Sequence, residues 1–195
     1  MTLDEILKEI QEAEKIVMLA HETPDGDAIG SLLGLKLGLE KIGKKADVIV
    51  TKYARTFDFL PAIDVLKTES DIKKYDLAIS LDCATIKRLD NREYFENAKK
   101  TIVIDHHGSN NMYGDINYVN PVAPACAEIV LSMLSYYNIE IDSKIGTCLM
   151  TGIITDTGVL QYPSTTADTF EYASELLRKG EDNATRYNLA LCKKL

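Results

Sequence analysis

The feature that most constrains this chain is a set of short, apolar runs separated by long amphipathic stretches. The predicted strands are residues 16–20, 47–50, 77–81 and 101–104. Short runs without polar alternation are typical of strands buried on both faces, and such strands occur in parallel sheets covered by helices. Parallel neighbours need a crossover connection, and the intervening stretches are long enough to supply one, although residues 51–67 are ambiguous.

Apolar residues recur at helical spacing between and after these runs. The predicted helices are residues 3–14, 28–42, 125–137, 143–155, 166–179 and 183 onward. Asp142 is suited to cap the helix at 143, residues 165–168 resemble a capping box, and Gly180 is a natural stop. The alternation of strands and helices predicts an α/β fold, with a mainly parallel sheet flanked by helices in Rossmann-like layers.

Three glycines, Gly30, Gly34 and Gly38, lie four residues apart in the predicted helix 28–42. They form one smooth stripe, because residues four apart share a helix face. We expect this stripe to let the helix pack closely on the sheet.

Length and composition limit the class of protein. The 195 residues correspond to about one domain. The net charge of −8 argues against binding duplex nucleic acid through a basic surface, but not against short anionic substrates. The four cysteines form no C-x-x-C pair, which favours reduced thiols in a cytoplasmic protein. No signal-peptide core or membrane-length apolar stretch is found, so we expect no membrane partner.

Polar residues of one chemical kind follow three of the predicted strands and one helix. They are His21 with Asp25 and Asp27, then Asp82, then Asp105, His106 and His107, and finally Asp156. Taken singly, most such residues are turn or capping residues. Because the carboxyl ends of parallel strands meet at one edge of the sheet, where open α/β folds bind ligands, we expect these side chains to converge.

Such convergence has an electrostatic cost that points to metal ions. Clustered carboxylates repel one another and raise each other's pKa values, and divalent cations relieve that repulsion. Mixed carboxylate and imidazole ligands suit Mn²⁺ or Fe²⁺, and less often Mg²⁺ or Zn²⁺. Since at least four carboxylates balance two divalent ions in charge, the sequence predicts a two-metal site.

Four ordered motifs resemble those of the DHH phosphoesterase family. They are residues 21–31 (HETPDGDAIGS), Asp82, the triplet 105–107 (DHH) and residues 155–158 (TDTG). The first motif is closest to the nanoRNase branch, whose members are bifunctional oligoribonucleases and 3′-phosphoadenosine-5′-phosphate (PAP) phosphatases. The likeness runs from residue 16 to about residue 180, and it implies that residues 1–195 form a DHH catalytic domain.

The resemblance also implies a role for each motif residue. It implies a first metal site of His21, Asp25 and Asp82, and a second of Asp27, Asp82, His106 and Asp156, bridged by Asp82. It places His107 against the substrate phosphate, as a charge-neutralising group or proton donor, and Asp105 behind the two imidazoles as their support. The implied cofactors are two divalent ions, Mn²⁺ by preference, with Mg²⁺ or Fe²⁺ as alternatives.

The implied activity is Mn²⁺-dependent hydrolysis of short oligonucleotides, linear diadenylate or PAP by two-metal activation of water. Family members usually continue into a Gly-rich substrate-binding domain, and no Gly-rich run follows Asp156. We therefore expect a catalytic half that is weak without that C-terminal domain in cis, rather than a naturally minimal enzyme; a homodimer is compatible with the sequence. Two alternatives stay open, an inorganic pyrophosphatase or exopolyphosphatase, and a non-catalytic metal- or nucleotide-binding module.

Overall fold

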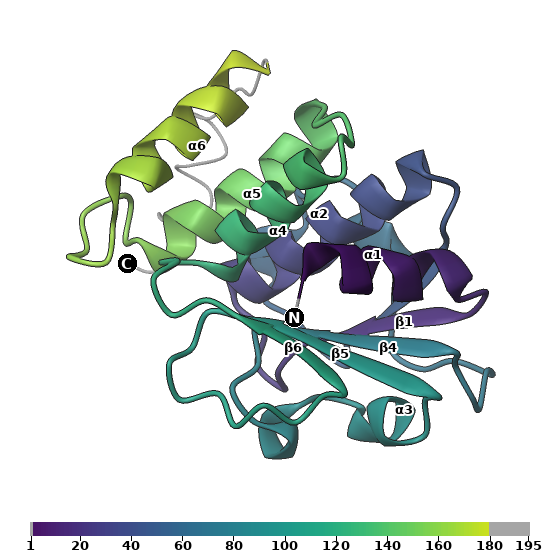
Figure 1. Ribbon diagram of the computed structural model, residues 1–195. Coiled ribbons are helices and arrows are strands. Elements are labelled where there is room, and N and C mark those ends of the chain that lie inside the picture. The colour runs from purple at the N-terminus through teal and green to yellow at the C-terminus, as the bar shows by residue number, and fades with distance from the viewer. Residues whose placement is uncertain (1, 180–195) are drawn as a thin grey trace.

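A six-stranded, all-parallel sheet forms the middle layer of the computed structural model, which describes residues 2–179 (Figure 1). The strands are β1 (Ile16–Leu19), β2 (Ala46–Ile49), β3 (Leu66–Lys67), β4 (Leu77–Leu81), β5 (Lys100–Asp105) and β6 (Ile116–Val119). Their order is β3-β2-β1-β4-β5-β6. The chain adds β2 and β3 on one side of β1 and then returns to add β4, β5 and β6 on the other side. The predicted α/β fold with a mainly parallel sheet is confirmed.

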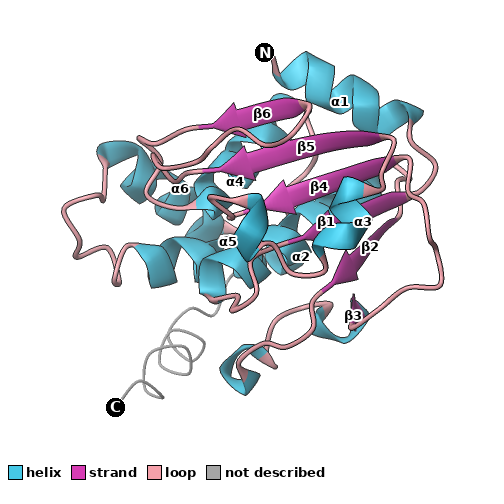
Figure 2. Ribbon diagram, turned by 90° about the horizontal axis from the view of Figure 1, so that it is seen from below, coloured by secondary structure: helices cyan, strands magenta, loops and turns pink. Residues whose placement is uncertain are grey.

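Helices cover both faces of this sheet. They are α1 (Leu3–Glu12), α2 (Gly26–Lys41), α3 (Arg92–Glu96), α4 (Cys126–Tyr136), α5 (Ser143–Asp156) and α6 (Ala167–Arg178). Figure 1 shows α1, α2, α4 and α5 above the sheet, and α3 lies below it, nearest the viewer in Figure 2. Among the described residues, no helix is both long enough and apolar enough to cross a membrane.

The central strand β1 is apolar throughout because it buries side chains on both faces. In β1, Met18 belongs to the large core beneath α2, α4 and α5. Its neighbours Val17 and Leu19 belong to a smaller core on the opposite face, which Phe95 of α3 covers. Alternating residues of one strand therefore serve two cores, and a continuous apolar run results.

Local capping explains several element boundaries. Helix α2 begins at Gly26, two residues before the predicted start, because the Asp25 carboxylate accepts hydrogen bonds from the backbone N–H groups of Asp27 and Ala28 at 3.0 and 3.1 Å. Asp142 caps α5 as predicted. The capping box of α6 is formed by Thr166 and Thr169, one residue later than predicted.

Three elements were not predicted, and two predictions lie outside the described residues. They are β3 and β6, which are the two edge strands at opposite ends of the sheet order, and α3, which spans only five residues. Short edge strands carry polar residues, such as Asn117 in β6, and so lack the apolar run that marks a central strand. The predicted helix from residue 183 and the stop at Gly180 fall beyond residue 179.

The glycine stripe of α2 faces other helices and not the sheet, which corrects the prediction. A methyl group on Gly30 would overlap the carbonyl oxygen of Cys148 in α5. At Gly34 it would meet Leu149 of α5, and at Gly38 it would meet Leu134 of α4. The missing side chains thus let α2 approach α5 and α4 closely, and this approach fixes Asp27 near the amino end of α4.

Candidate metal centre

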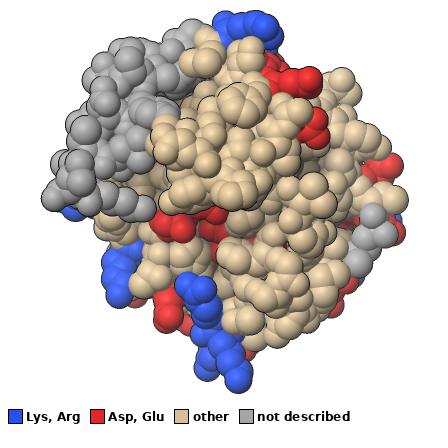
Figure 3. Space-filling view, turned by 90° about the vertical axis from the view of Figure 1, so that its left-hand side faces the viewer, with Lys and Arg blue, Asp and Glu red and all other residues tan. Residues whose placement is uncertain are grey.

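All eight predicted site residues lie at one edge of the sheet, around the carboxyl ends of β1, β4 and β5. They form three groups whose ligand atoms lie within 4.8 Å of one another: His21, Asp25 and Asp82; Asp27, His106 and Asp156; and Asp82, Asp105, His106 and His107. Figure 3 faces this edge and shows acidic atoms recessed among uncharged neighbours. The sequence-based expectation of convergence therefore agrees with the geometry.

Asp82 is the common member of two groups. Its Oδ2 lies 3.7 Å from His21 Nε2, and its Oδ1 lies 3.4 Å from His106 Nε2 and 3.6 Å from His107 Nδ1. The residue follows β4 directly and has a left-handed backbone, with φ of 52°. Few residues other than glycine adopt that conformation, and strain of this kind gathers at functional sites.

Asp27 is held by the amino end of a remote helix. Its Oδ2 accepts a hydrogen bond from the backbone N–H of Cys126 at 2.6 Å, and its Oδ1 accepts one from Ala127 at 2.9 Å. Ala125, the N-cap residue of α4, has no side chain that could cap the helix. The Asp27 carboxylate supplies the missing cap and gains from the helix dipole, although it is fully buried.

His106 presents a defined nitrogen to the carboxylates. Its Nδ1 lies 3.2 Å from the carbonyl oxygen of Ala123, and because a carbonyl can only accept, Nδ1 carries the proton. The other nitrogen, Nε2, lies 3.4 Å from Asp82 and from Asp156, and 3.8 Å from Asp27. This arrangement orients the lone pair of Nε2 for a metal ion, as backbone carbonyls do in metal sites.

Asp105 braces the two imidazoles from behind. Its Oδ1 accepts hydrogen bonds from the His106 backbone N–H at 2.9 Å and from His107 Nδ1 at 2.8 Å. Its Oδ2 accepts a third from Asn110 Nδ2 at 2.6 Å. With its oxygens satisfied by these contacts, Asp105 orients His107, and its carboxylate raises the pKa of that imidazole.

The crowding of charge shifts the pKa values in opposite directions. Burial, with Asp82 and Asp156 nearby, raises the pKa of Asp27 well above its usual value. Burial also opposes ionisation of Asp82, but the imidazoles of His106 and His21 outweigh it and hold the pKa of Asp82 below its usual range. Burial favours neutral His106, yet the surrounding carboxylates raise its pKa to about 9. Burial, Asp25 and Asp82 raise the pKa of Asp156 to about 6.

Several buried polar atoms of the cluster have no hydrogen-bond partner. Among the described residues, five buried side-chain atoms are unpartnered, and three of them belong to this cluster: His21 Nδ1, Asp82 Oδ1 and His106 Nε2. An unpaired buried polar atom is costly, so native proteins rarely keep one without a reason. Lone pairs from carboxylates and imidazoles, gathered without partners, fit divalent cations of the Mn²⁺ type.

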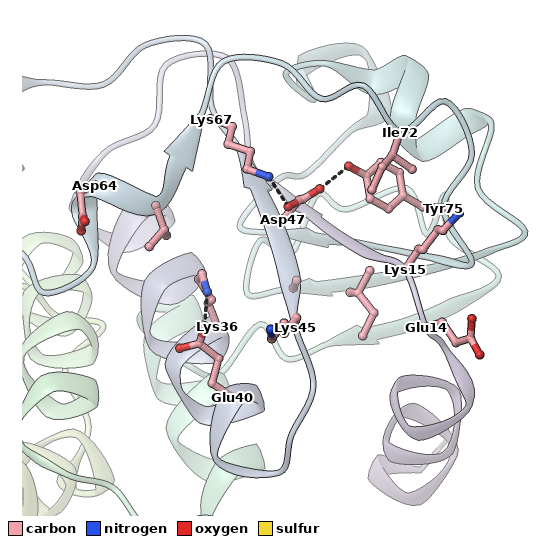
Figure 4. Close-up of a pocket in the computed structure, with 13 residues that line it drawn as sticks. Glu14, Lys15, Lys36, Glu40, Lys45, Asp47, Asp64, Lys67, Ile72 and Tyr75 are labelled. Atoms are coloured by element: carbon pink, nitrogen blue, oxygen red, sulfur yellow. Dashed lines mark hydrogen bonds and ion pairs between the residues drawn. The ribbon is translucent and has the colours of Figure 1, made fainter.

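A larger cavity lies at the opposite end of the sheet. The cavity at the metal centre has a volume of about 110 Å³. A cavity of about 450 Å³ lies at the amino ends of β1 and β2, where Lys36 faces Glu40 and Lys67 faces Asp47 (Figure 4). Volume alone would therefore select the wrong region, whereas the chemistry of the lining selects the metal centre.

Some residues of the centre were not anticipated from the sequence. They are Asn110, which holds Asp105; Arg88, which lines the cavity; and the backbone N–H groups of Cys126 and Ala127, which hold Asp27. Only the last left a signal in the sequence. A predicted helix that begins at Ala125 without a capping residue indicates that its cap comes from a distant part of the chain.

Comparison with known proteins agrees with this geometry. The family model described as the DHH family, N-terminal domain, matches residues 15–153. This chain belongs to the DHH family. Seven of the eight clustered residues lie inside the matched range of the DHH domain, and Asp156 follows it. The predicted family is thus confirmed.

Individual relatives of this DHH chain are longer than the chain itself. The bifunctional oligoribonuclease and PAP phosphatase NrnA of Thermus thermophilus is 34% identical over 90% of this chain and 53% of its own length. NrnA of Bacillus subtilis is 29% identical over 94% of this chain and 59% of its own length. The crystal structure of an exopolyphosphatase-related protein from Bacteroides fragilis matches with a TM-score of 0.89 and 28% identity, over 97% of this chain and 60% of that one.

Proposed function

We propose that this DHH chain is the catalytic part of a metal-dependent phosphoesterase that hydrolyses short nucleotides. The observation that carries the proposal is the pair of buried, unpartnered atoms Asp82 Oδ1 and His106 Nε2 at the strand ends, with His21 Nε2 beside Asp82. Carboxylates and imidazoles together suit Mn²⁺ better than Mg²⁺, which prefers oxygen alone. The names of the NrnA relatives, oligoribonuclease and PAP phosphatase, support the substrate class.

The grouping of the ligand atoms supports two ions. One ion would be held by His21, Asp25 and Asp82, and the other by Asp27, Asp82, His106 and Asp156, with Asp82 shared. Four ionised carboxylates against two divalent ions leave the cluster neutral, whereas a single ion would leave two negative charges without compensation. When bound, a pair of such ions lowers the pKa of water and stabilises charge on a phosphoryl group.

His107 is the residue that would meet the substrate. Its side chain is 39% exposed, against 13% for His106, so it faces the cavity and not the interior of the cluster. Its Nδ1 donates to Asp105, which leaves Nε2 available to a phosphate oxygen. Because Asp105 raises the pKa of His107, the imidazolium form is favoured, and it can neutralise a phosphate or protonate a leaving oxygen.

A further part of the enzyme would complete the substrate site. This chain spans little more than half of each NrnA relative. We propose that the additional segment of the longer proteins holds the remainder of the substrate, so that residues 1–195 alone turn over substrate slowly. A cytoplasmic location follows from the same proposal, since short RNA and PAP are intracellular compounds.

A substrate panel tests the proposed function. The purified chain, with Mn²⁺ present, is incubated with the 5′-phosphorylated diadenylate pApA, PAP, short RNA and pyrophosphate, and the products are separated by chromatography. We expect slow release of AMP from pApA and PAP, abolished by EDTA and by Asp82→Asn. Hydrolysis of pyrophosphate alone would favour the alternative of a pyrophosphatase or exopolyphosphatase. That alternative is included because the Bacteroides fragilis protein is described as exopolyphosphatase-related. Bound Mn²⁺ without hydrolysis of any substrate would favour a binding module and contradict the proposal.

A further inference from the structure

Arg88 gives the rim of the metal centre a permanent positive charge that metal binding does not explain. It lines the same cavity as His21, Asp82 and His107, and among the described residues it is the only lysine or arginine that does so. Its side chain is exposed, and within residues 2–179 its guanidinium has no hydrogen bond or ion pair. The guanidinium is therefore available to a ligand.

The backbone fixes Arg88 beside a metal ligand. The carbonyl oxygen of Arg88 accepts a hydrogen bond from the N–H of Glu22 at 2.9 Å, and the N–H of Asp90 donates to the carbonyl oxygen of Ala20, also at 2.9 Å. Between these bonds, Leu89 forms an isolated antiparallel bridge with His21. The two segments are thus tied together on both sides of His21, and the anchor of Arg88 does not depend on its own side chain.

Charge balance indicates what Arg88 would bind. When ionised, the carboxylates of Asp25, Asp27, Asp82 and Asp156 carry four negative charges, which two divalent ions would cancel. A substrate with one phosphate between the ions adds negative charge at the cluster, and a second phosphate adds charge outside it. A guanidinium presents a planar fork of donors that matches phosphate oxygens in pairs, and Arg88 offers this fork at the rim.

We infer that Arg88 binds a second, non-scissile phosphate of the substrate, so that the site prefers short nucleotides carrying two phosphate groups. The inference rests on the proposed function and adds a specificity-determining residue to it. Arg88 contacts the substrate in this view, but it holds no metal ion and does not take part in proton transfer.

Two matched ligand pairs test the inference. Binding to the Mn²⁺-loaded chain is measured by calorimetry with a phosphonate-linked diadenosine that carries or lacks a 5′-phosphate, and kcat/KM is measured for pApA and ApA. The wild type should prefer the 5′-phosphorylated member of each pair, and Arg88→Ala should reduce the preference about tenfold or more. Arg88→Lys keeps the positive charge but not the planar fork of donors, so its preference should lie between those of the wild type and Arg88→Ala.

Lys87→Ala is the matched control, because Lys87 is the exposed neighbour of Arg88 and does not line the cavity. It should behave as the wild type, and all variants should keep the wild-type Mn²⁺ stoichiometry and melting temperature. An unchanged preference in Arg88→Ala, or an equal loss for both members of a pair, would overturn the inference. An Arg88-dependent binding preference without hydrolysis by the wild type would contradict the proposed function alone.

Discussion

The two ends of the sheet carry charged cavities of opposite character. At the amino end, charges are paired: Lys67 Nζ lies 2.6 Å from Asp47 Oδ1, Tyr75 donates a hydrogen bond to Asp47 Oδ2 at 2.7 Å, and Lys36 contacts Glu40 at 2.5 Å. At the carboxyl end, no lysine or arginine of residues 2–179 forms an ion pair with Asp27 or Asp82. The charged groups of the amino end thus have partners of opposite charge within the protein, whereas Asp27 and Asp82 at the carboxyl end have no lysine or arginine partner among residues 2–179.

This difference shows that unsatisfied chemistry locates a site better than volume does. The amino-end cavity is the larger, at about 450 Å³ against about 110 Å³. Its buried groups already have the partners that a ligand would have to displace, and displacement costs free energy. At the carboxyl end, the unpartnered Asp82 Oδ1 and His106 Nε2 would gain partners from a ligand, so binding would relieve a cost already present.

The largest expected effect comes from removing one carboxylate at each end. Asp82→Asn should weaken Mn²⁺ binding by more than about a hundredfold and impair both proposed sites, because Asp82 is shared between them. The matched variant Asp47→Asn, which removes an equally short acid at the amino end, should leave the affinity and a stoichiometry of about two Mn²⁺ per chain unchanged. Isothermal titration of the metal-free protein with Mn²⁺ measures both quantities. A loss of only one ion in Asp82→Asn would contradict the bridging role.

An intermediate effect on the free energy of unfolding is expected from pH, because His106 at the carboxyl end and Asp47 at the amino end titrate in different pH ranges. The surrounding carboxylates raise the pKa of His106 to about 9 in the folded protein, against about 6.5 in the unfolded chain. Its stabilising contribution is thus complete below pH 6.5 and is lost as the pH rises through about 9, with a magnitude on the order of 2–3 kcal/mol. Burial opposes ionisation of Asp47, but Lys67 and Tyr75 outweigh it and lower its pKa, so its contribution is lost only in acid.

Urea unfolding in EDTA, repeated between pH 6.5 and 9.5, measures this effect. The free energy of unfolding should fall across the range in the wild type and in Asp47→Asn, and the fall should be much smaller in His106→Gln. With saturating Mn²⁺, stability should instead rise with pH, because the ion competes with the proton for His106. A flat profile in EDTA would show that His106 does not carry the charge that its carboxylate neighbours favour.

The sequence predicted the convergence of the candidate ligands at the carboxyl end because their position follows from topology. His21, Asp82 and Asp105 each end an apolar run, and parallel strands bring such ends together. It did not predict what holds those ligands. The bond from Cys126 to Asp27 joins residues 99 positions apart, and no local pattern encodes a contact of that kind. The pair of Asp47 and Lys67 was missed for the same reason, since Asp47 lies on β2 and Lys67 lies on the short strand β3, which itself was not predicted.

The smallest expected effect belongs to Lys36, which lies on the same helix as Asp27 but at the other end. The side chain of Lys36 is only 10% exposed, so its ammonium group loses most of its hydration on folding. Its partner Glu40 is 44% exposed, and the water around that carboxylate weakens the ion pair. Lys36→Met should therefore change the free energy of unfolding by no more than about 1 kcal/mol, because the Glu40 carboxylate left without its partner is 44% exposed and stays hydrated. Mn²⁺ affinity should not change, because α2 positions Asp27 through its glycine contacts with α5 and not through Lys36. A shift in Mn²⁺ affinity, measured in the same titration, would show that the two ends of the sheet are coupled through α2.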